Sequence, residues 1–469
     1  MLLLERDGHV ASLVQYAEEA RAGHGRTVLM AGEAGVGKSS LLDALEQELT
    51  DALWYWGTCD GLFTPRPLAP LLDIADQIGG ELKLLCDSGA PRDQLFSELV
   101  RHLHTPDRLT VLAIEDVHWA DEATLDLLRF LGRRLRDSAT LLVITYRDDG
   151  LAQDDPLRVA VGELSMHRTT RRLSLAPLST DAVAGMAAAA GADPARLYAL
   201  TGGNPYYVCE VLQTAEAALP ESVRDAVLAR VAAVSANARE VLDVAALMGA
   251  RVDHQLLERA TGASSAILDE LLACGVIVSD ADQLRFRHEI ARMAIQSAIP
   301  PHRIRSTHRT ILDALLQAGL QDDARLAFHA EGAGDVGLVL EYAPRAGRRA
   351  SELAAHREAA AQFERSLRAA DQADDRTTAS LYDDLAGELA LVDRWQDSAN
   401  AREEALRRWR AVGDPLREGD SLRRYSRVMW RLCRGDEADS AAVKALELLA
   451  PLGPSPELAW AYANLANNK

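Results

Sequence analysis

The segment Gly32–Ser40, GEAGVGKSS, constrains the fold of this chain more than any other feature. It follows a short apolar run, TVLMA, that is typical of a buried strand, and it precedes SSLLDALEQEL, which has the periodicity of an amphipathic helix. A strand, a glycine-rich turn and a helix in this order predict a phosphate-binding loop, because glycines let successive backbone N–H groups point at phosphates. We therefore predict that the chain binds a nucleoside triphosphate.

The side chains of this segment have separate predicted roles. The amino end of the following helix presents its positive dipole end to the phosphates. Lys38 is expected to reach the β- and γ-phosphates as a point charge, and the Ser39 hydroxyl to bind Mg²⁺. Only four of the 51 Lys and Arg residues are lysines, so Lys38 stands out against an arginine-rich background. The residues predicted to bind nucleotide here are Gly32, Gly35, Val36, Gly37, Lys38, Ser39 and Ser40.

Length and charge limit the class of protein. A chain of 469 residues has room for about three or four domains. A formal net charge of −19 argues against a broad nucleic-acid-binding face. The apolar runs are too short to span a bilayer, the start MLLLERD lacks the features of a secretory signal, and the five cysteines show no metal-ligand spacing. We expect a cytoplasmic protein with reduced cysteines and no membrane contact.

A second motif carries two adjacent acids. The run LTVLAIEDVHWADEATLDLL begins at Leu109 and predicts a buried strand that ends at Glu115 and Asp116. Carboxylates at the end of a central strand, in a chain with a phosphate loop, suit a Mg²⁺ ligand and a residue that polarises the attacking water. We assign Glu115 to the metal and Asp116 to the water, although the two roles could be exchanged. His118 is interpreted as a structural or sensing residue rather than a proton donor.

A further apolar run, ATLLVITYRDD, ends in Arg147. An adjacent strand would bring this cation to the γ-phosphate, so Arg147 is a candidate sensor. The alternative is a surface arginine paired with Asp148 or Asp149. Strands that alternate with helices through this first third predict a parallel sheet with both faces covered.

The rest of the chain is mainly helical. LTGGNPYYVCEVL predicts two helices joined by a tight turn at Gly202–Pro205. From about Leu219 to Leu316 we expect several short helices and a small hairpin at GVIVSDADQLRFRHE, and these helices with the hairpin suggest a winged helix. The stretches AAAQFERSLRAAD, AREEALRRWRAVGD and AVKALELLAPLGP recur about 40 residues apart and predict a helical solenoid. Such a solenoid typically receives a ligand or partner on its concave surface.

The predicted fold is therefore an α/β P-loop core followed by an all-α lid, a winged helix and a TPR-like helical solenoid. The chain stops after the first helix of another repeat, so we expect it to be the front part of a longer protein. The predicted domains are residues 1–165 for the core, 166–218 for the lid, 219–316 for the winged helix and 317–469 for the repeats.

These motifs resemble the STAND class of P-loop ATPases, and in particular the ATPase-plus-repeat region of large ATP-binding LuxR-type transcriptional regulators. The segments LLERD, GEAGVGKSS, TPRPLAPL, LAIEDVHWADE, TYRDD, TGGNPYYVCEVL and LRFRHEIARMAI occur in the family order. HWAD after the acidic pair, together with GGNP, is the most specific part. The resemblance implies that Glu5 and Arg6 lie near the adenine, that Pro205 packs by the base, and that His288 contacts the β-phosphate.

The resemblance also implies an ATP/ADP-operated switch that uses Mg²⁺. ADP would lock the core, lid and winged helix together, and an inducer ligand or protein on the repeats would favour exchange for ATP, self-association and slow hydrolysis. DNA would be bound only by a domain absent from this chain. Three alternatives remain: the same module with another output such as a cyclase or kinase, a remodelling motor, and a scaffold that nucleotide merely stabilises.

Overall fold

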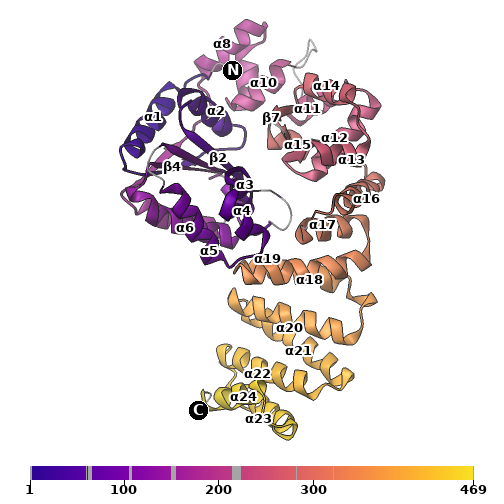
Figure 1. Ribbon diagram of the computed structural model, residues 1–469. Coiled ribbons are helices and arrows are strands. Elements are labelled where there is room, and N and C mark those ends of the chain that lie inside the picture. Colours follow the sequence, from indigo (N-terminus) through magenta and orange to yellow (C-terminus); the bar gives the residue numbers. More distant parts are fainter. Residues whose placement is uncertain are drawn as a thin grey trace. The chain divides into compact units, whose positions relative to one another are not determined.

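The computed structural model of this chain divides into two compact units, Met1–Gly319 and Leu320–Lys469 (Figure 1). This division falls close to residue 317, where the sequence places the start of the repeats. The residues that the structure describes are 3–59, 61, 66–104, 108–148, 155–213, 223–280, 283–320 and 322–467.

The first unit is built on a five-stranded parallel sheet with the order β2-β3-β4-β1-β5. Its strands are β1 (Arg26–Ala31), β2 (Leu53–Thr58), β3 (Thr110–Glu115), β4 (Thr140–Tyr146) and β5 (Thr170–Ser174). The three central strands are almost wholly buried because they are runs of apolar residues with helices on both faces. The α/β core with a parallel sheet is confirmed. Since β4 lies between β1 and β3, the residues that follow these three strands meet at one edge of the sheet.

Helices cover both faces of this sheet (Figure 1). The helices that belong to the core are α1 (Asp7–Arg21), α2 (Lys38–Glu48), α3 (Ala69–Ile78), α4 (Gly80–Asp87), α5 (Arg92–Leu103), α6 (Glu122–Arg134) and α7 (Pro156–Ser165). On one face, Leu13 of α1 and Leu41 and Leu45 of α2 pack with Val28 and Val143 in a single buried cluster. This packing fixes the direction of α2, and so the place where its amino end meets the sheet edge.

Strand β5 corrects the predicted end of the core at residue 165. It pairs in parallel with β1, with Thr27 opposite Thr170, so the sheet extends through Ser174. Only Leu173 of this edge strand is buried. Because an edge strand with one buried residue has no apolar run, its sequence gave no strand signal.

The remainder of the first unit holds two groups of elements. The first group, which follows the sheet and ends before residue 214, consists of α8 (Thr180–Ala190), α9 (Pro194–Thr201) and α10 (Pro205–Gln213). The helices from residue 223 onward are α11 (Val223–Ala232), α12 (Ala236–Met248), α13 (His254–Thr261), α14 (Ser265–Cys274), α15 (Glu289–Ala298) and α16 (Pro301–Ala318). The predicted boundary between lid and winged helix, at residues 218 and 219, lies outside the described residues.

A small antiparallel sheet accompanies the second group. Its strands are β6 (Arg251–Asp253), β7 (Ile277–Asp280) and β8 (Gln283–Phe286), in the order β6-β8-β7. The predicted hairpin is present as the pair β7–β8, although Ala281 and Asp282 of its turn lie outside the described residues. The winged-helix interpretation of these helices and strands stays a prediction.

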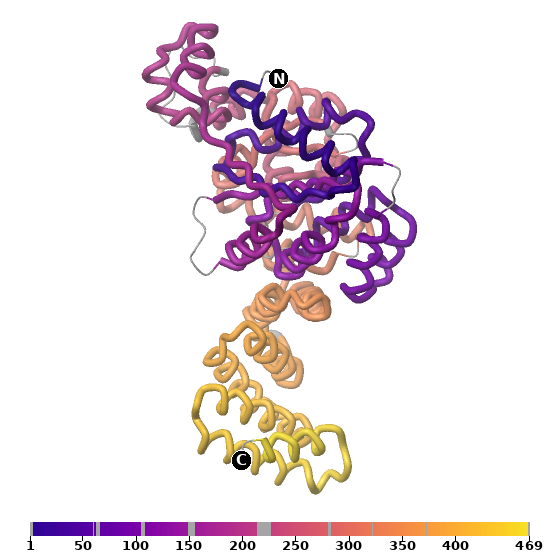
Figure 2. The backbone as a smooth tube through the Cα atoms, turned by 90° about the vertical axis from the view of Figure 1, so that its left-hand side faces the viewer, coloured from indigo at the N-terminus to yellow at the C-terminus, as the bar shows by residue number. Residues whose placement is uncertain are grey.

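The described residues of the second unit form helical hairpins. They comprise α17 (Asp323–Ala333), α18 (Val336–Glu352), α19 (His356–Arg368), α20 (Asp375–Leu391), α21 (Trp395–Val412), α22 (Pro415–Arg431), α23 (Gly435–Leu449) and α24 (Pro456–Asn467). Figure 2 shows these hairpins following one another within the unit. The three similar stretches found in the sequence lie in α19, α21 and α23, so the repeat unit is one helical hairpin.

The backbone of the hairpins repeats as well. Ala354, Asp393 and Cys433 each adopt a left-handed conformation, with φ of 58°, 61° and 58°, at the turn that closes a hairpin. Non-glycine residues seldom adopt this conformation, so its recurrence marks equivalent positions of the repeat. No helix in the described part of the chain is both long enough and apolar enough to cross a membrane.

Candidate nucleotide-binding site

The glycine-rich loop connects β1 to α2 and depends on its glycines. Gly35 and Gly37 adopt φ of 78° and 101°, a region that side-chain-bearing residues seldom adopt. A Cβ on Gly35 would lie 2.8 Å from the Cβ of Tyr206, so there is also no room for one. Helix α2 begins at Lys38 with no side-chain cap. Its first N–H groups therefore suit an anion at the loop.

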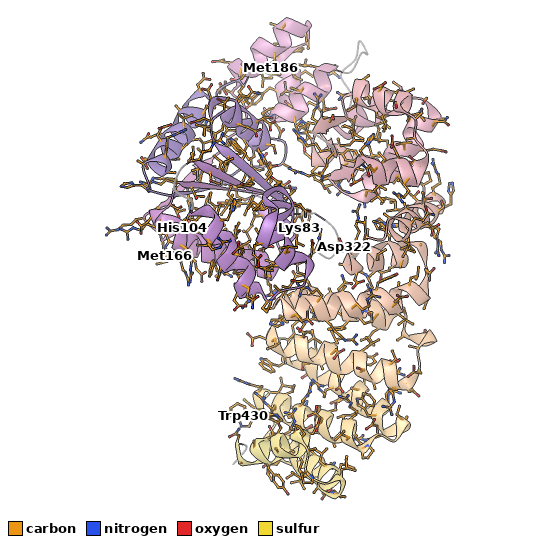
Figure 3. All side chains as sticks on the ribbon, in the orientation of Figure 1. Lys83, His104, Met166, Met186, Asp322 and Trp430 are labelled. Carbon is orange, nitrogen blue, oxygen red and sulfur yellow. The ribbon has the colours of Figure 1, made fainter. Side chains whose placement is uncertain are left out.

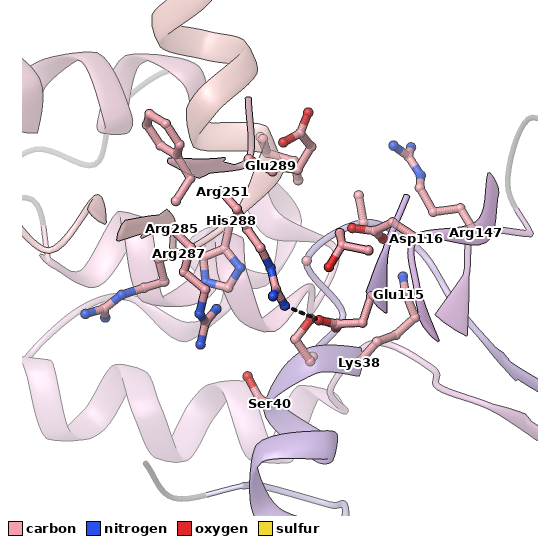
Figure 4. A pocket seen from close by; sticks show the side chains of 18 of the residues that line it. Lys38, Ser40, Glu115, Asp116, Arg147, Arg251, Arg285, Arg287, His288 and Glu289 are labelled. Atoms are coloured by element: carbon pink, nitrogen blue, oxygen red, sulfur yellow. Dashed lines mark hydrogen bonds and ion pairs between the residues drawn. The ribbon is translucent and has the colours of Figure 1, made fainter. Parts of the chain in front are cut away.

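A cavity of about 320 Å³ opens beside this loop (Figure 4). Three parts of the first unit line it: the phosphate loop with the start of α2, the ends of β2, β3 and β4, and the small antiparallel sheet with the residues next to it. Of the residues predicted to form the site, the cavity is lined by Gly35, Gly37, Lys38, Ser39, Ser40, Glu115, Asp116, Arg147 and His288. Residues as far apart in sequence as Gly35 and His288 thus converge on one cavity.

Lys38 is held at the mouth of the loop. Its Nζ donates hydrogen bonds to the carbonyl oxygens of Gly32 at 2.7 Å and Glu33 at 2.9 Å. The residue is buried, yet it lines the cavity. The loop backbone thereby fixes the ammonium where a phosphate in the cavity would meet it.

Two oxygen donors meet next to Lys38. Ser39 Oγ donates a hydrogen bond of 2.6 Å to Glu115 Oε1, although the two residues come from α2 and β3. Hydroxyl and carboxylate oxygens are ligands that suit Mg²⁺. These two residues therefore fit a bound Mg²⁺ ion, and they are the ones that would hold it.

Asp116 lies where β3 ends. Its φ of 55° turns the chain away from the strand, and its N–H donates to Thr145 Oγ1 at 3.0 Å. Burial and the neighbouring Glu115 raise the pKa of Asp116 to about 7, against the opposing charges of Lys38 and Arg147. The side chain lies deep in the molecule but stays 40% exposed, because it faces the cavity. Both carboxylates of the acidic pair thus reach the cavity, as the sequence predicted for a strand end.

Arg147 follows β4, between the strands that carry the loop and the acidic pair. It lines the cavity and contributes to the charge environment of Asp116 (Figure 4). Its position agrees with the sensor interpretation, although its predicted role toward a γ-phosphate stays a prediction.

The small sheet and the residue that follows β8 contribute three arginines that sequence reasoning missed: Arg251, Arg285 and Arg287. Arg251 and Arg285 stand directly opposite each other on β6 and β8. The two positive charges repel each other in this position, so negatively charged groups nearby are needed to stabilise the pair. Arg251 Nη2 lies 3.7 Å from Glu115 Oε2, drawn as a dashed line in Figure 4, and Arg285 Nη2 lies 3.7 Å from Asp43 Oδ2.

A sequence signal existed for only part of this group. In LRFRHE the arginines alternate with apolar residues, which places Arg285 and Arg287 on one face of the extended chain. Arg251 lies in a strand of three residues, which is too short to produce a pattern. Only the folded chain brings it to the cavity.

His288 lines the same cavity and contacts α10. Its ring centroid lies 4.0 Å from that of Tyr206. Burial and the charges of Arg287 and Arg285 lower the pKa of His288 to about 3, so the imidazole is neutral at neutral pH. A neutral imidazole can still donate one hydrogen bond to a phosphate oxygen.

The GGNP turn, Gly202–Pro205, and the residue after it contact the phosphate loop through hydrogen bonds. Asn204 is buried, and its Nδ2 donates to the Ala34 carbonyl oxygen at 2.8 Å. The N–H of Tyr206 donates to the Gly35 carbonyl oxygen at 3.3 Å. The sequence indicated only a sharp turn. Pro205 is the first residue of α10 and is not among the residues that line the cavity, so its packing against a base stays a prediction.

Glu5 and Arg6 hold the start of the chain in place. Arg6 Nη2 donates to the carbonyl oxygens of Ala176 at 2.6 Å and Val36 at 3.4 Å. The Glu5 carboxylate accepts from the N–H of Ser179 at 2.9 Å and from its hydroxyl at 2.5 Å. Arg6 therefore connects the loop to the segment before α8, and Glu5 ties the start of the chain to that same segment. They are not among the cavity-lining residues, and their place near an adenine stays a prediction.

The HWAD motif is largely structural. Asp121 is buried and caps α6 by accepting from the N–H of Thr124 at 3.0 Å, and it also accepts from the N–H of Leu68 at 3.1 Å. His118 lines the cavity, with its Nδ1 3.9 Å from Asp116 Oδ1. This motif thus positions the segment that follows the acidic pair.

Comparisons with known proteins agree with this geometry. Residues 2–144 match the AAA ATPase domain family. An uncharacterized protein of Rhizobium meliloti is 25% identical, and the alignment covers 82% of this chain and 44% of that protein. The chain thus spans less than half the length of this curated relative.

The crystal structure of a STAND protein with a tetratricopeptide repeat sensor from Pyrococcus horikoshii has the same fold. The two share 16% sequence identity with a TM-score of 0.51, over 97% of this chain and 79% of that one. This chain therefore carries an AAA ATPase domain followed by a largely helical remainder, with the fold of a STAND protein that has a TPR sensor.

Proposed function

We propose that this chain is the ATP/ADP-operated switch of a LuxR-type transcriptional regulator. The observation that carries the proposal is the single cavity shared by the phosphate loop, the acidic pair and the small sheet. The order of the sequence motifs supports the LuxR-type assignment. Binding of DNA is assigned to a region outside these 469 residues.

The cavity suits a triphosphate with Mg²⁺. Backbone N–H groups of the loop and the cations Lys38, Arg147, Arg251, Arg285 and Arg287 would face its negative charge. Ser39 and Glu115 would hold Mg²⁺, which supplies further neutralisation of phosphate charge when it is bound. Asp116 is the residue we propose orients the attacking water in a slow hydrolysis that resets the switch. If the two acids have the reverse roles, Glu115→Gln will impair hydrolysis but not Mg²⁺ binding.

Contacts around the loop support a closed state. Arg251 lies against Glu115, the proposed metal ligand, so this arginine and a metal ion compete for the same carboxylate. Asn204 joins the loop to α10, and Tyr206 joins α10 to His288. We propose that the small sheet shifts enough for Arg251 to leave Glu115 when this carboxylate binds metal. Exchange of ADP for ATP with Mg²⁺ would accompany this movement.

The helical repeats are the proposed sensor. An inducer ligand or protein bound there favours the open state only if it binds that state better than the closed one. The open, ATP-bound form is proposed to self-associate. No membrane participates in this mechanism.

Mass in solution tests the switch. The purified chain is measured by light scattering with ADP and with a non-hydrolysable ATP analogue plus Mg²⁺, beside the Lys38→Ala variant. We expect a monomer with ADP, a larger species with the analogue, and no response in the variant. Equal masses with both bound nucleotides would refute nucleotide-controlled assembly and favour a scaffold that nucleotide merely stabilises.

A further inference from the structure

The second unit contains a cavity of about 620 Å³ that the proposed nucleotide site does not use. Residues of α20, α21, α22 and α24 line it, so it lies within the helical repeats. Its volume falls in the range of about 300–1,000 Å³ that is usual for small-molecule pockets. The cavity lies within one unit, so its geometry does not depend on how the two units are arranged.

The charge of this cavity is unusual for the chain. Five arginines line it, with no aspartate or glutamate among the lining residues, although the whole chain carries a formal charge of −19. The five are Arg402, Arg423, Arg424, Arg427 and Arg431. Three of these arginines form ion pairs with two acids that are not among the lining residues. Asp383 pairs with Arg402, and Asp420 pairs with Arg423 and Arg424. In the described residues no carboxylate forms an ion pair with Arg427 or Arg431.

Three of these arginines form a row on one face of α22. Arg423, Arg427 and Arg431 are spaced four residues apart, so their side chains lie close together. Like charges at this spacing destabilise a helix. Of this row only Arg423 has an acid beside it, so an anionic ligand would relieve the repulsion that Arg427 and Arg431 add to the cavity wall.

Arg402 provides an independent observation. It is 2% exposed, and its Nη1 binds Asp383, but its Nε is buried without a hydrogen-bond partner in the described part of the chain. A buried N–H group without an acceptor is unfavourable. Since Arg402 lines the cavity, its guanidinium adds a buried positive charge to the cavity wall, with a hydrogen-bonding capacity that Asp383 does not fully use.

Aromatic side chains complete the cavity. Trp395, Trp430 and Trp460 line it, and Trp430 (labelled in Figure 3) and Trp460 stay 53% and 62% exposed. The Arg431 guanidinium lies 5.4 Å from the Trp395 ring centroid and 5.7 Å from that of Trp430. Broad indole faces beside cations suit a flat ring that bears a negative charge.

We propose that this cavity binds a small organic anion that carries a flat ring. The charged group is a carboxylate or a phosphate, which contacts the α22 arginines and Arg402, while the ring stacks on the tryptophans. This ligand is of the inducer class, and that part of the proposal rests on the proposed function. An acidic peptide is the other occupant to be tested.

Calorimetry on the full chain tests the cavity, in a Lys38→Ala background so that phosphate probes do not bind at the nucleotide site. The probes are 1-naphthoate, 1-naphthyl phosphate, the neutral 1-naphthamide and an acidic octapeptide. We expect at least one naphthyl anion to bind about tenfold or more tighter than the amide. The tighter of the two anions identifies the charged group. Equal binding of anions and amide, binding of the peptide alone, or no binding at all would overturn the proposal.

Two arginines of α22 provide matched variants. Arg427→Gln removes a cavity cation and should weaken anion binding about fivefold or more, whereas Arg417→Gln changes an exposed residue of the same helix outside the cavity and should leave it unchanged. Both positions are exposed, so both variants should keep the melting temperature. Equal anion affinity of the two variants would overturn the proposed site.

The two proposals can fail separately. If naphthyl anions bind but do not alter the mass response to nucleotide in the chain with Lys38 intact, the cavity assignment stands and its link to the switch is wrong. If nucleotide changes the mass but no naphthyl anion binds, the switch stands and the cavity assignment is wrong.

Discussion

The nucleotide cavity of the first unit and the cavity in the helical repeats are both rich in arginine, but they are built in opposite ways. The cavity of the first unit forms around a backbone turn, and its cations face acids such as Glu115 and Asp43. The cavity of the second unit forms between helices, mainly from side chains, and has no acid in its lining. The first is suited to a fixed polyanion and a metal ion, whereas the second is suited to an anion whose ring packs on adaptable side chains.

This difference indicates which kinds of substitution should impair each site. A backbone-built site depends on a few glycines and on the residues that hold them, so one added methyl group can disturb it. A site made of side chains on helices tolerates substitutions that leave the backbone unchanged. Its affinity for a ligand depends on the charges and the aromatic surface that line it. The following predictions separate the two cases, beginning with the largest expected effect.

Lys38→Ala should weaken ATP binding by about 100-fold or more, because it removes the ammonium that the loop carbonyls hold at the cavity. The measurement is a titration with a fluorescent ATP analogue. Lys83→Ala is the matched control, since Lys83 is a partly exposed lysine of α4, outside the cavity, paired with Asp76 and Asp87. Retained binding in the Lys38 variant would refute the phosphate-loop assignment.

Gly35→Ala changes the site that is built on a backbone turn, and Gly387→Ala changes a helix of the site that is built between helices. Gly35 has a positive φ and no room for a Cβ, so alanine should cost about 1–2 kcal/mol for the backbone alone and weaken ATP binding about tenfold or more. Gly387 lies inside α20 with nothing within 4 Å of an added Cβ, so alanine should stabilise the protein by about 0.5–1 kcal/mol.

Thermal unfolding and the ATP titration measure both glycine variants. A stabilised Gly35 variant with normal ATP affinity would show that the turn geometry does not determine binding.

Asn204→Ala should lower stability by about 1 kcal/mol and weaken nucleotide binding, since it breaks the hydrogen bond between α10 and the loop carbonyl of Ala34. Asn400→Ala, at an exposed position of α21, is the control. If both variants melt at the wild-type temperature and bind ATP normally, the GGNP turn is no more than a connection.

Arg251→Gln should raise Mg²⁺ affinity in the nucleotide complex by a few-fold at most, because a partly exposed pair at 3.7 Å is worth about 0.2–1 kcal/mol. Arg285→Gln removes the same charge from the same small sheet but leaves the contact with Glu115 intact, so it should not show this gain. Equal Mg²⁺ affinity in both variants would argue against competition between Arg251 and the metal.

The sequence predicted those parts of the site that local chemistry encodes. Glycine spacing around Lys38 and an acidic pair at the end of an apolar run leave a readable pattern, because the backbone turn and the strand end need those residues in that order. Arg251 was missed because its strand has three residues, and β5 was missed because an edge strand with one buried residue shows no apolar run.

The second cavity could not be predicted in the same way. Its lining residues are spread from Gly387 to Asn467 on four helices, and each stretch alone looks like an ordinary repeat helix with a solvated arginine face. Only the stacking of hairpins brings Arg402 next to α22 and Trp460. Long-range packing, not local propensity, creates this site.

The most direct test of the central claim is to denature the purified chain, identify any released nucleotide by chromatography, and titrate the nucleotide-free chain with ADP and ATP. If a nucleotide is held between the phosphate loop and the small sheet, we expect denaturation to release about one ADP per chain. The nucleotide-free chain should then bind added ADP tightly. No released nucleotide, together with no binding of either added nucleotide, would contradict the claim.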